Sequence, residues 1–114
     1  MINPESLDLK ALPSMPLSNR RNLPIISCIY FALSSGKVQY IGRSANLQQR
    51  WIQHHRQQYL EINSNIAWLE ISNIDLLPQI EAALIEWFKP PLNREFADPA
   101  IKKIATKSGK ARIV

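Results

Sequence analysis

The stretch IISCIYFALSSGKVQYIG, residues 25–42, contains two strand-like runs separated by a turn. Residues 25–33 are rich in apolar and β-favouring side chains, which predicts a buried strand. Residues 37–41 alternate polar and apolar side chains, as a second strand would. Because Ser34-Ser35-Gly36 between them is a turn signal, we expect an antiparallel hairpin that ends at Gly42.

Two helices and a third strand are expected after the hairpin. Ser44 is a candidate N-cap for a helix over about residues 45–60, and residues 65–71 predict the third strand. A second helix is expected to open at Asp75 and Pro78 and to stop at Pro90-Pro91. The predicted fold is α+β, a small three-stranded antiparallel sheet flanked by helices. The predicted apolar helix faces comprise Leu47, Trp51, Ile52, His55 and Tyr59 on the first helix, and Leu77, Ile80, Ala83, Leu84, Trp87 and Phe88 on the second.

Composition divides the chain into three parts. Residues 1–24 contain four prolines, which disfavour regular helix and central strand, and predict an extended N-terminal arm. Residues 25–96 form the expected folded domain, and residues 97–114 form a basic C-terminal tail. The first residues lack a long apolar run, so neither a signal peptide nor a membrane anchor is expected.

The bulk composition favours a single folded domain with an anionic partner. The chain has 114 residues, of which 46% are hydrophobic, and a formal net charge of +5. This size supports one core, and the positive charge favours polyanions such as nucleic acid. Cys28 is the only cysteine, which excludes an intramolecular disulfide and a cysteine-rich zinc site and suits a cytoplasmic protein.

Two pairs of side chains are candidates for a functional site. Tyr30 and Tyr40 lie on neighbouring strands of the hairpin, where antiparallel pairing can bring their side chains to one face. Taken alone, they are more typical of ordinary core tyrosines. Arg50 and His54 are four residues apart on the first helix and share a face, an arrangement that suits an anion, although a solvated basic edge has the same pattern.

Glu81 is the most unusual charged residue of the second helix. Its helical neighbours include Leu77, Leu84 and Ile85, and no charged side chain lies three or four residues away from it. A carboxylate in apolar surroundings needs a partner from elsewhere in the chain or a metal ion. After the helix, Asn93 presents an amide that can bond a phosphate, the backbone or nearby side chains.

Together these residues resemble the GIY-YIG nuclease superfamily, which includes the catalytic domains of excision-repair and homing endonucleases. Cys28-Ile29-Tyr30 and Tyr40-Ile41-Gly42 resemble the two halves of its signature, with Cys28 in place of a glycine. The similarity extends over about residues 26–93. Further matches to the family pattern are Arg43 and Ser44 after the signature, the catalytic arginine at Arg50, a histidine or tyrosine position at His54, the metal-binding glutamate at Glu81 and the asparagine at Asn93.

The resemblance implies a metal-dependent endonuclease that hydrolyses phosphodiester bonds in DNA. Glu81 would bind one Mg²⁺ or Mn²⁺ ion and Arg50 the scissile phosphate, while Asn93 would orient neighbouring groups. Gly42, Arg43 and Ser44 are expected to contact the substrate. The proton of the attacking water could go to Tyr30, Tyr40 or His54, and the sequence leaves this choice open.

Other functional questions also stay open at this stage. The alternative is a non-catalytic DNA-binding or assembly module that retains the fold. No zinc finger or helix-turn-helix is evident in the sequence. Targeting would therefore come from the arm, the tail, a second copy of the chain or a partner protein, and weak intrinsic specificity or recognition of DNA shape is expected. DNA repair, mobile-element defence and restriction are all possible roles.

Overall fold

The computed structural model of the chain describes residues 3–53, 60 and 63–93. The predicted hairpin is confirmed: β2 (Cys28–Ser34) pairs antiparallel with β3 (Lys37–Ser44). Ser35 and Gly36 both have positive φ, which is the requirement of a tight turn whose twist matches the strands. Strand β3 continues past Gly42 to Ser44, so the expected end at Gly42 was wrong. Pairing with the start of β2 extends it, since Cys28 lies opposite Ser44.

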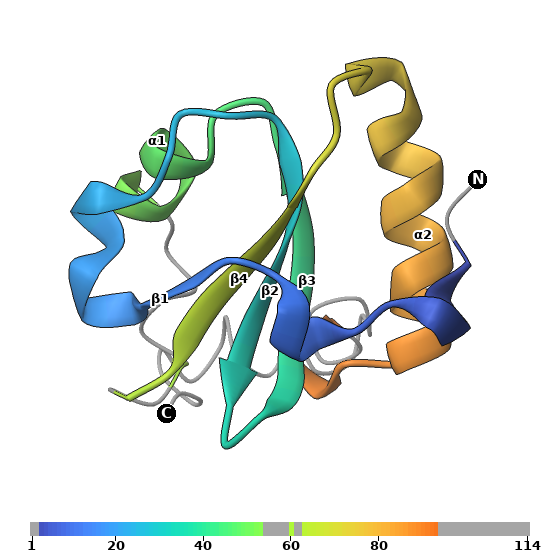
Figure 1. The fold of residues 1–114 in the computed structure, drawn as a ribbon, viewed down its shortest axis with the longest axis horizontal. Helices are drawn as coiled ribbons and strands as arrows, with labels where there is room; N and C mark the ends of the chain where they lie inside the picture. The colour runs from blue at the N-terminus through green and yellow to red at the C-terminus, as the bar shows by residue number, and fades with distance from the viewer. Residues whose placement is uncertain (1–2, 54–59, 61–62, 94–114) are drawn as a thin grey trace, which may run out of the picture.

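The hairpin belongs to a four-stranded antiparallel sheet. Its order is β1-β4-β2-β3, so β3 forms one edge and β1 (Ser14–Pro16) the other (Figure 1). Strand β4 (Asn65–Glu70) confirms the third predicted strand and pairs with both β1 and β2. The α+β class is therefore confirmed with one strand more than expected, and that strand comes from the proline-containing arm. Its position at the edge suits Pro16, which has no N–H to donate to a neighbour.

The sheet separates two hydrophobic clusters, with helices covering both faces (Figure 1). One face packs against η3 (Leu17–Asn22) and α1 (Leu47–Gln53), and the other against α2 (Leu77–Phe88). Alternate residues of β2 point to opposite faces, as a strand requires. The first cluster is Leu17, Leu23, Cys28, Tyr30, Ala32, Tyr40, Leu47, Trp51 and Ile66. The second is Ile29, Phe31, Ile41, Ala67, Leu77, Ile80 and Leu84.

Helix α1 begins later than predicted. Asn46, not Ser44, acts as its N-cap, because the Asn46 side-chain oxygen accepts from the Gln49 N–H at 3.1 Å. The Ser44 hydroxyl instead accepts from the Asn46 N–H at 3.0 Å, in the turn that leads from β3 into the helix. Ile52 is 41% exposed and does not join the apolar face, whereas Leu47 and Trp51 are fully buried. Residues 54–59 of the expected helix lie outside the described residues.

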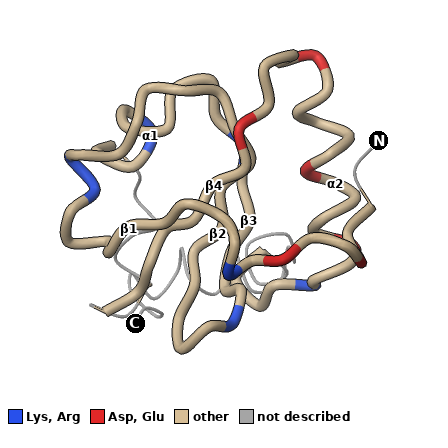
Figure 2. Tube along the Cα trace, in the orientation of Figure 1, with Lys and Arg blue, Asp and Glu red and all other residues tan. Residues whose placement is uncertain are grey.

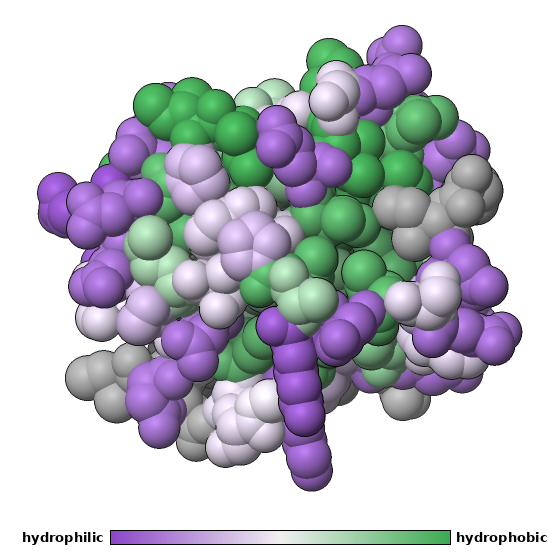
Figure 3. All heavy atoms as spheres, viewed as in Figure 1, coloured by the Kyte–Doolittle hydropathy of each residue, from purple (hydrophilic) through white to green (hydrophobic). Residues whose placement is uncertain are grey.

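Helix α2 confirms the second predicted helix and follows a short 3-10 turn, η5 (Ile74–Leu76). Leu77, Ile80 and Leu84 are buried against the sheet, but Trp87 is 51% exposed and lies outside the apolar face predicted for it. Lys89 ends the helix in the left-handed conformation, with its N–H donating to the Ile85 carbonyl at 2.8 Å. Between the sheet and α2, apolar surface remains visible in Figure 3.

Residues 3–24, which we call the N-terminal strap, run around the sheet from the α2 side to the α1 side (Figure 1). The strap contains η1 (Pro4–Ser6), η2 (Leu9–Ala11), β1 and η3. Backbone hydrogen bonds tie it to β4, including one from the Trp68 N–H to the Pro13 carbonyl at 3.1 Å. Its Leu23 is only 1% exposed, so the strap contributes to the core. Of the described helices, none has the length and apolar character needed to cross a membrane.

Candidate active site

The phenol of Tyr30 lies across the neighbouring edge strand, over Gly42. The two residues are partners in the β2–β3 register, so they face the same side of the sheet. A Cβ atom added at Gly42 would lie 2.3 Å from the Tyr30 hydroxyl oxygen, closer than any real contact. Glycine at position 42 is therefore what allows the phenol to lie across the edge strand β3.

Two aromatic side chains fix the ring of Tyr30 in this position. The Tyr40 ring lies on the same face with its centroid 6.2 Å away, so the two predicted tyrosines do come together. The indole of Trp51, on α1, makes an edge-to-face contact at 5.4 Å. Tyr30 and Trp51 are fully buried, and Tyr40 is nearly so. The sequence identified Trp51 as a core residue but gave no sign that it packs on the site.

Arg50 approaches Tyr30 from α1. Its Nε–H donates to the Tyr30 hydroxyl oxygen at 3.3 Å. Burial raises the pKa of Tyr30 above its ordinary value, and the nearby Tyr40 raises it further, whereas Arg50 acts in the opposite direction. The pKa of Arg50 is raised as well, chiefly by its hydrogen bond to Tyr30. The buried phenol therefore keeps its proton near neutral pH, and the guanidinium keeps its charge.

Glu81 is paired with Arg43. The Arg43 Nη1 donates to the Glu81 Oε1, joining strand β3 to helix α2. The Glu81 side chain is 18% exposed and that of Arg43 is 48% exposed. The partner that the isolated carboxylate required thus comes from a distant part of the chain. The family resemblance indicated Arg43 as a substrate-binding residue, and no sequence pattern identified it as this partner.

The candidate groups are divided between the two faces of the sheet, on either side of β3. Arg43 lies opposite Ile29 in the register and so belongs to the α2 face, whereas Tyr30 belongs to the α1 face. The Glu81 carboxylate makes a minor contribution to the raised pKa of both Tyr30 and Arg50. Figure 2 shows the same division, with acidic positions on α2 and basic positions on η3 and α1. A polyanion at this edge would meet positive charge from α1 and a carboxylate from α2.

Asn93 supports the strand that carries Tyr40 and Gly42. Its Oδ1 accepts from the Ile41 N–H, and its Nδ2 donates to the Ile41 carbonyl, each at 2.8 Å. The amide thereby pairs with the edge of β3 as a further strand would. Of the remaining candidates, Ser44 is engaged in the turn before α1, and His54 lies outside the described residues.

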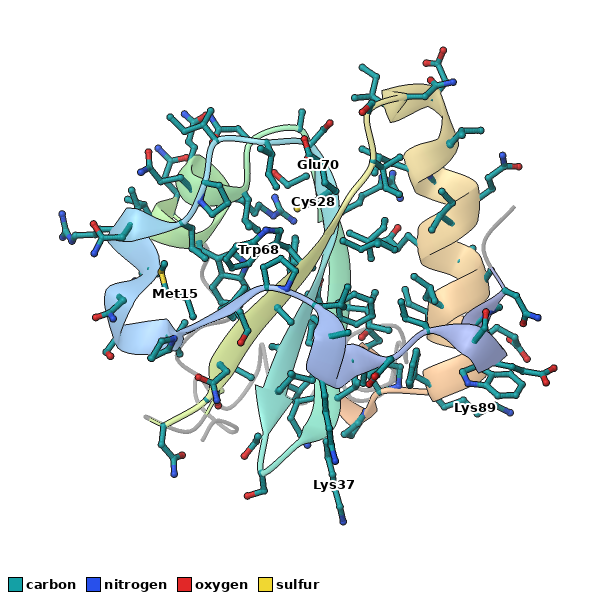
Figure 4. The ribbon with its side chains drawn as sticks, viewed as in Figure 1. Met15, Cys28, Lys37, Trp68, Glu70 and Lys89 are labelled. Atoms are coloured by element: carbon teal, nitrogen blue, oxygen red, sulfur yellow. The ribbon has the colours of Figure 1, made fainter. Side chains whose placement is uncertain are left out.

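Cys28 lies in the hydrophobic core. It is fully buried and lies opposite Glu70 in the β2–β4 register, as Figure 4 illustrates at one end of the sheet. Burial, and to a smaller extent Glu70, raise the pKa of its thiol to about 12. The thiol therefore stays protonated near neutral pH, which is the behaviour of a packing residue.

The site offers a divalent cation one carboxylate. Among residues 3–53, 60 and 63–93, no group of three or more His, Cys, Asp or Glu side chains could hold a metal ion. Mg²⁺ suits such a site, since it often binds through one or two carboxylates and takes its other ligands from water and substrate phosphates. The Glu81 carboxylate is paired with Arg43 in this structure, so an ion that bound there would take the place of the guanidinium. The residues present therefore fit a single hydrated ion.

Comparison with known proteins adds a family and a fold. A model of the GIY-YIG catalytic domain matches residues 26–95. The N-terminal GIY-YIG endonuclease domain of UvrC from Thermotoga maritima, solved with magnesium as its catalytic divalent cation, is similar with a TM-score of 0.55 and 20% identity, over 66% of this chain and 92% of that one. A tyrosine-to-phenylalanine point mutant of that domain is similar with a TM-score of 0.52 and 18% identity, over 65% and 89%. No curated protein matches the sequence.

Proposed function

The chain belongs to the GIY-YIG catalytic domain family, and from this premise we propose that it is a metal-dependent endonuclease that hydrolyses phosphodiester bonds in DNA. One observation carries the proposal: Arg50, from α1, donates to the hydroxyl of Tyr30, which lies beside Tyr40 and over Gly42. A guanidinium held by a phenol, with the Glu81 carboxylate on the neighbouring helix α2, suits a reaction in which negative charge grows on a phosphate.

Arg50 and Glu81 would both stabilise the negative charge that develops in the reaction, Glu81 through a bound metal ion and Arg50 directly. Glu81 would hold the divalent ion, Mg²⁺ or Mn²⁺, which when bound supplies Lewis-acid stabilisation of the leaving oxygen. Arg50 donates to Tyr30 through Nε and has further N–H groups on its two amino nitrogens for the scissile phosphate. Charge-assisted bonds from a planar guanidinium would strengthen as the phosphoryl oxygens gain charge.

The phenols would position the attacking water and receive its proton. The raised pKa of Tyr30 means that this residue first acts as a neutral hydrogen-bonding group that orients Arg50 and water. It becomes a base only if added positive charge at the site lowers that pKa. Tyr40, whose ring lies beside it, and His54 are the alternative proton acceptors. Asn93 takes a positioning role, because its amide holds the Ile41 backbone between Tyr40 and Gly42.

The proposal predicts that nicking of supercoiled plasmid requires Mg²⁺ or Mn²⁺ and stops when EDTA is added. Glu81→Gln and Arg50→Ala should each lower the cleavage rate by about a hundredfold or more, because each removes a group that stabilises developing charge. Glu86→Gln is the matched control, since Glu86 is an exposed carboxylate on the same helix and should leave the rate unchanged.

Linear duplex, branched and single-stranded DNA should be assayed beside the plasmid, with binding measured on each. Cleavage that continues at the same rate in excess EDTA would contradict the metal mechanism. Salt-sensitive binding without cleavage of any substrate, with either metal, would instead favour the alternative, a DNA-binding module that retains the fold. Strict cutting at a single palindrome would contradict weak intrinsic specificity.

A further inference from the structure

The ion pair between Arg43 and Glu81 occupies the carboxylate oxygen that a divalent ion needs. The Arg43 Nη1 donates to Oε1 of Glu81, the residue proposed as the metal ligand. A guanidinium and a divalent cation repel each other, and both favour the same oxygen. The two cations cannot share that position without loss, so one must move when the other binds.

The two partners of this pair differ in how easily they can leave it. The Glu81 side chain is 18% exposed, and it projects from α2 between helical neighbours that include the buried Leu77 and Leu84. The Arg43 side chain is 48% exposed, and β3 is an edge strand. Arg43 can therefore move into water at little cost, whereas Glu81 has no comparable freedom. Because Arg43 can move and Glu81 cannot, a different cation can replace the Arg43 guanidinium while the Glu81 carboxylate stays in place.

We infer that Glu81 binds two cations in alternation: the guanidinium of Arg43 in the resting protein, and a divalent metal ion in the active protein. When the ion binds, the released guanidinium becomes available to a DNA phosphate at the same edge of the sheet. This inference rests on the proposed function. It assigns to Arg43 a role beyond substrate contact, since the residue keeps Glu81 oriented and neutralised before the ion arrives.

The exchange couples metal binding to DNA binding. Once displaced, the exposed guanidinium of Arg43 has lost its carboxylate partner, and another anion can take the place of Glu81. A phosphate matches this requirement, because a planar guanidinium can donate two parallel hydrogen bonds to it. By linkage, a divalent ion should then tighten DNA binding, and DNA should tighten metal binding by the same factor.

The test is to titrate Mn²⁺ alone, without DNA, and to measure free Mn²⁺ by electron paramagnetic resonance. The wild-type protein is compared with Arg43→Gln, Glu81→Gln and Arg21→Gln. Arg43→Gln should bind Mn²⁺ about fivefold more tightly, because the competing cation is gone. Glu81→Gln should lose the site. Arg21→Gln removes the same charge from an exposed position on η3 and should bind as the wild type does.

A second measurement follows Arg43 directly, through the Nε–H resonances of the arginines in a ¹⁵N-labelled sample. Mg²⁺ should shift the resonance that is missing from the spectrum of Arg43→Gln. The inference would be overturned if Arg43→Gln bound Mn²⁺ no more tightly than the wild type, or if Mg²⁺ left the Arg43 resonance unchanged. In either case, loss of Mn²⁺ binding in Glu81→Gln would still support the metal site. Equal binding by wild type and Glu81→Gln would instead overturn the metal site of the proposed function.

Discussion

At the scale of single residues, the site depends on Gly42, which has no side chain. Gly42 leaves room for the Tyr30 phenol, whose hydroxyl oxygen lies 2.3 Å from where a Cβ would be. The ring cannot retreat easily, because Trp51 packs against it at 5.4 Å. Even a methyl group at position 42 must therefore displace either the phenol or the strand.

Gly42→Ala should destabilise the fold by about 1–3 kcal/mol and also abolish cleavage, because it moves Tyr30 out of reach of Arg50. Gly36→Ala is the control: Gly36 has a φ of +77° but no atom within 4 Å of its added Cβ. It should cost about 1–2 kcal/mol through backbone strain alone and leave cleavage intact. Urea unfolding and plasmid nicking measure the two effects. Full activity of folded Gly42→Ala would contradict this role for the glycine.

What the sequence could predict at this scale follows from how far apart the partners are. The proximity of Tyr30 and Tyr40 could be predicted because a short turn fixes the register of the strands that carry them. The isolation of Glu81 on its helix could also be predicted, because helical neighbours lie three or four residues away. Its pairing with Arg43 could not, since the two are 38 residues apart and only the packing of α2 against β3 brings them together.

At the scale of elements, the exposed edge strand is held from outside the sheet. Asn93 gives Ile41 both a donor and an acceptor, at 2.8 Å each. Satisfying the edge in this way fixes the backbone between Tyr40 and Gly42. The arrangement needs an amide in particular, because a carboxylate can only accept hydrogen bonds at neutral pH.

Asn93→Asp should cost about 1–3 kcal/mol of stability, because the Ile41 carbonyl loses its donor and faces a carboxylate instead. Asn73→Asp is the matched control, because the Asn73 side chain accepts from the Asp75 N–H at 3.0 Å, a bond that a carboxylate oxygen can also make, and it should change stability by less than about 0.5 kcal/mol. At a temperature where Asn93→Asp remains folded, its kcat should fall more than its KM rises. An unchanged kcat would show that the amide supports the fold alone.

Element boundaries were the least predictable part of the fold. Ser44 has the right residue type for an N-cap, yet it belongs to β3 and the cap is Asn46. Both residues favour caps and turns through the same kind of side-chain hydrogen bond, so local preference does not distinguish them. The deciding factor is the pairing of Ser44 with Cys28, a contact made across the sheet.

At the scale of the whole molecule, the N-terminal strap belongs to the core although it lies outside the family match. Its prolines correctly disfavoured long helices and central strands. The sequence could not show that β1 would add to the sheet, because its partner β4 begins far along the chain. Leu17 and Leu23 are buried against the α1 face, where they complete the first hydrophobic cluster.

Leu23→Ala should therefore lower the free energy of unfolding by about 2–5 kcal/mol, as expected for a leucine removed from a packed core. Ile25→Ala is the control, because Ile25 is 68% exposed and should cost no more than about 0.5 kcal/mol. Chemical denaturation of both variants gives the comparison. Similar small losses in the two would mean that the strap adds little to stability.

The path of the N-terminal strap has a practical consequence for the choice of expression fragments. A recombinant fragment limited to residues 26–95, the span of the family match, would omit the leucines that seal one side of the sheet and the strand that covers its far edge. Such a fragment would expose apolar surface and an unpaired strand, two features that promote aggregation. We therefore expect the independently folding unit of this protein to begin before the family match does.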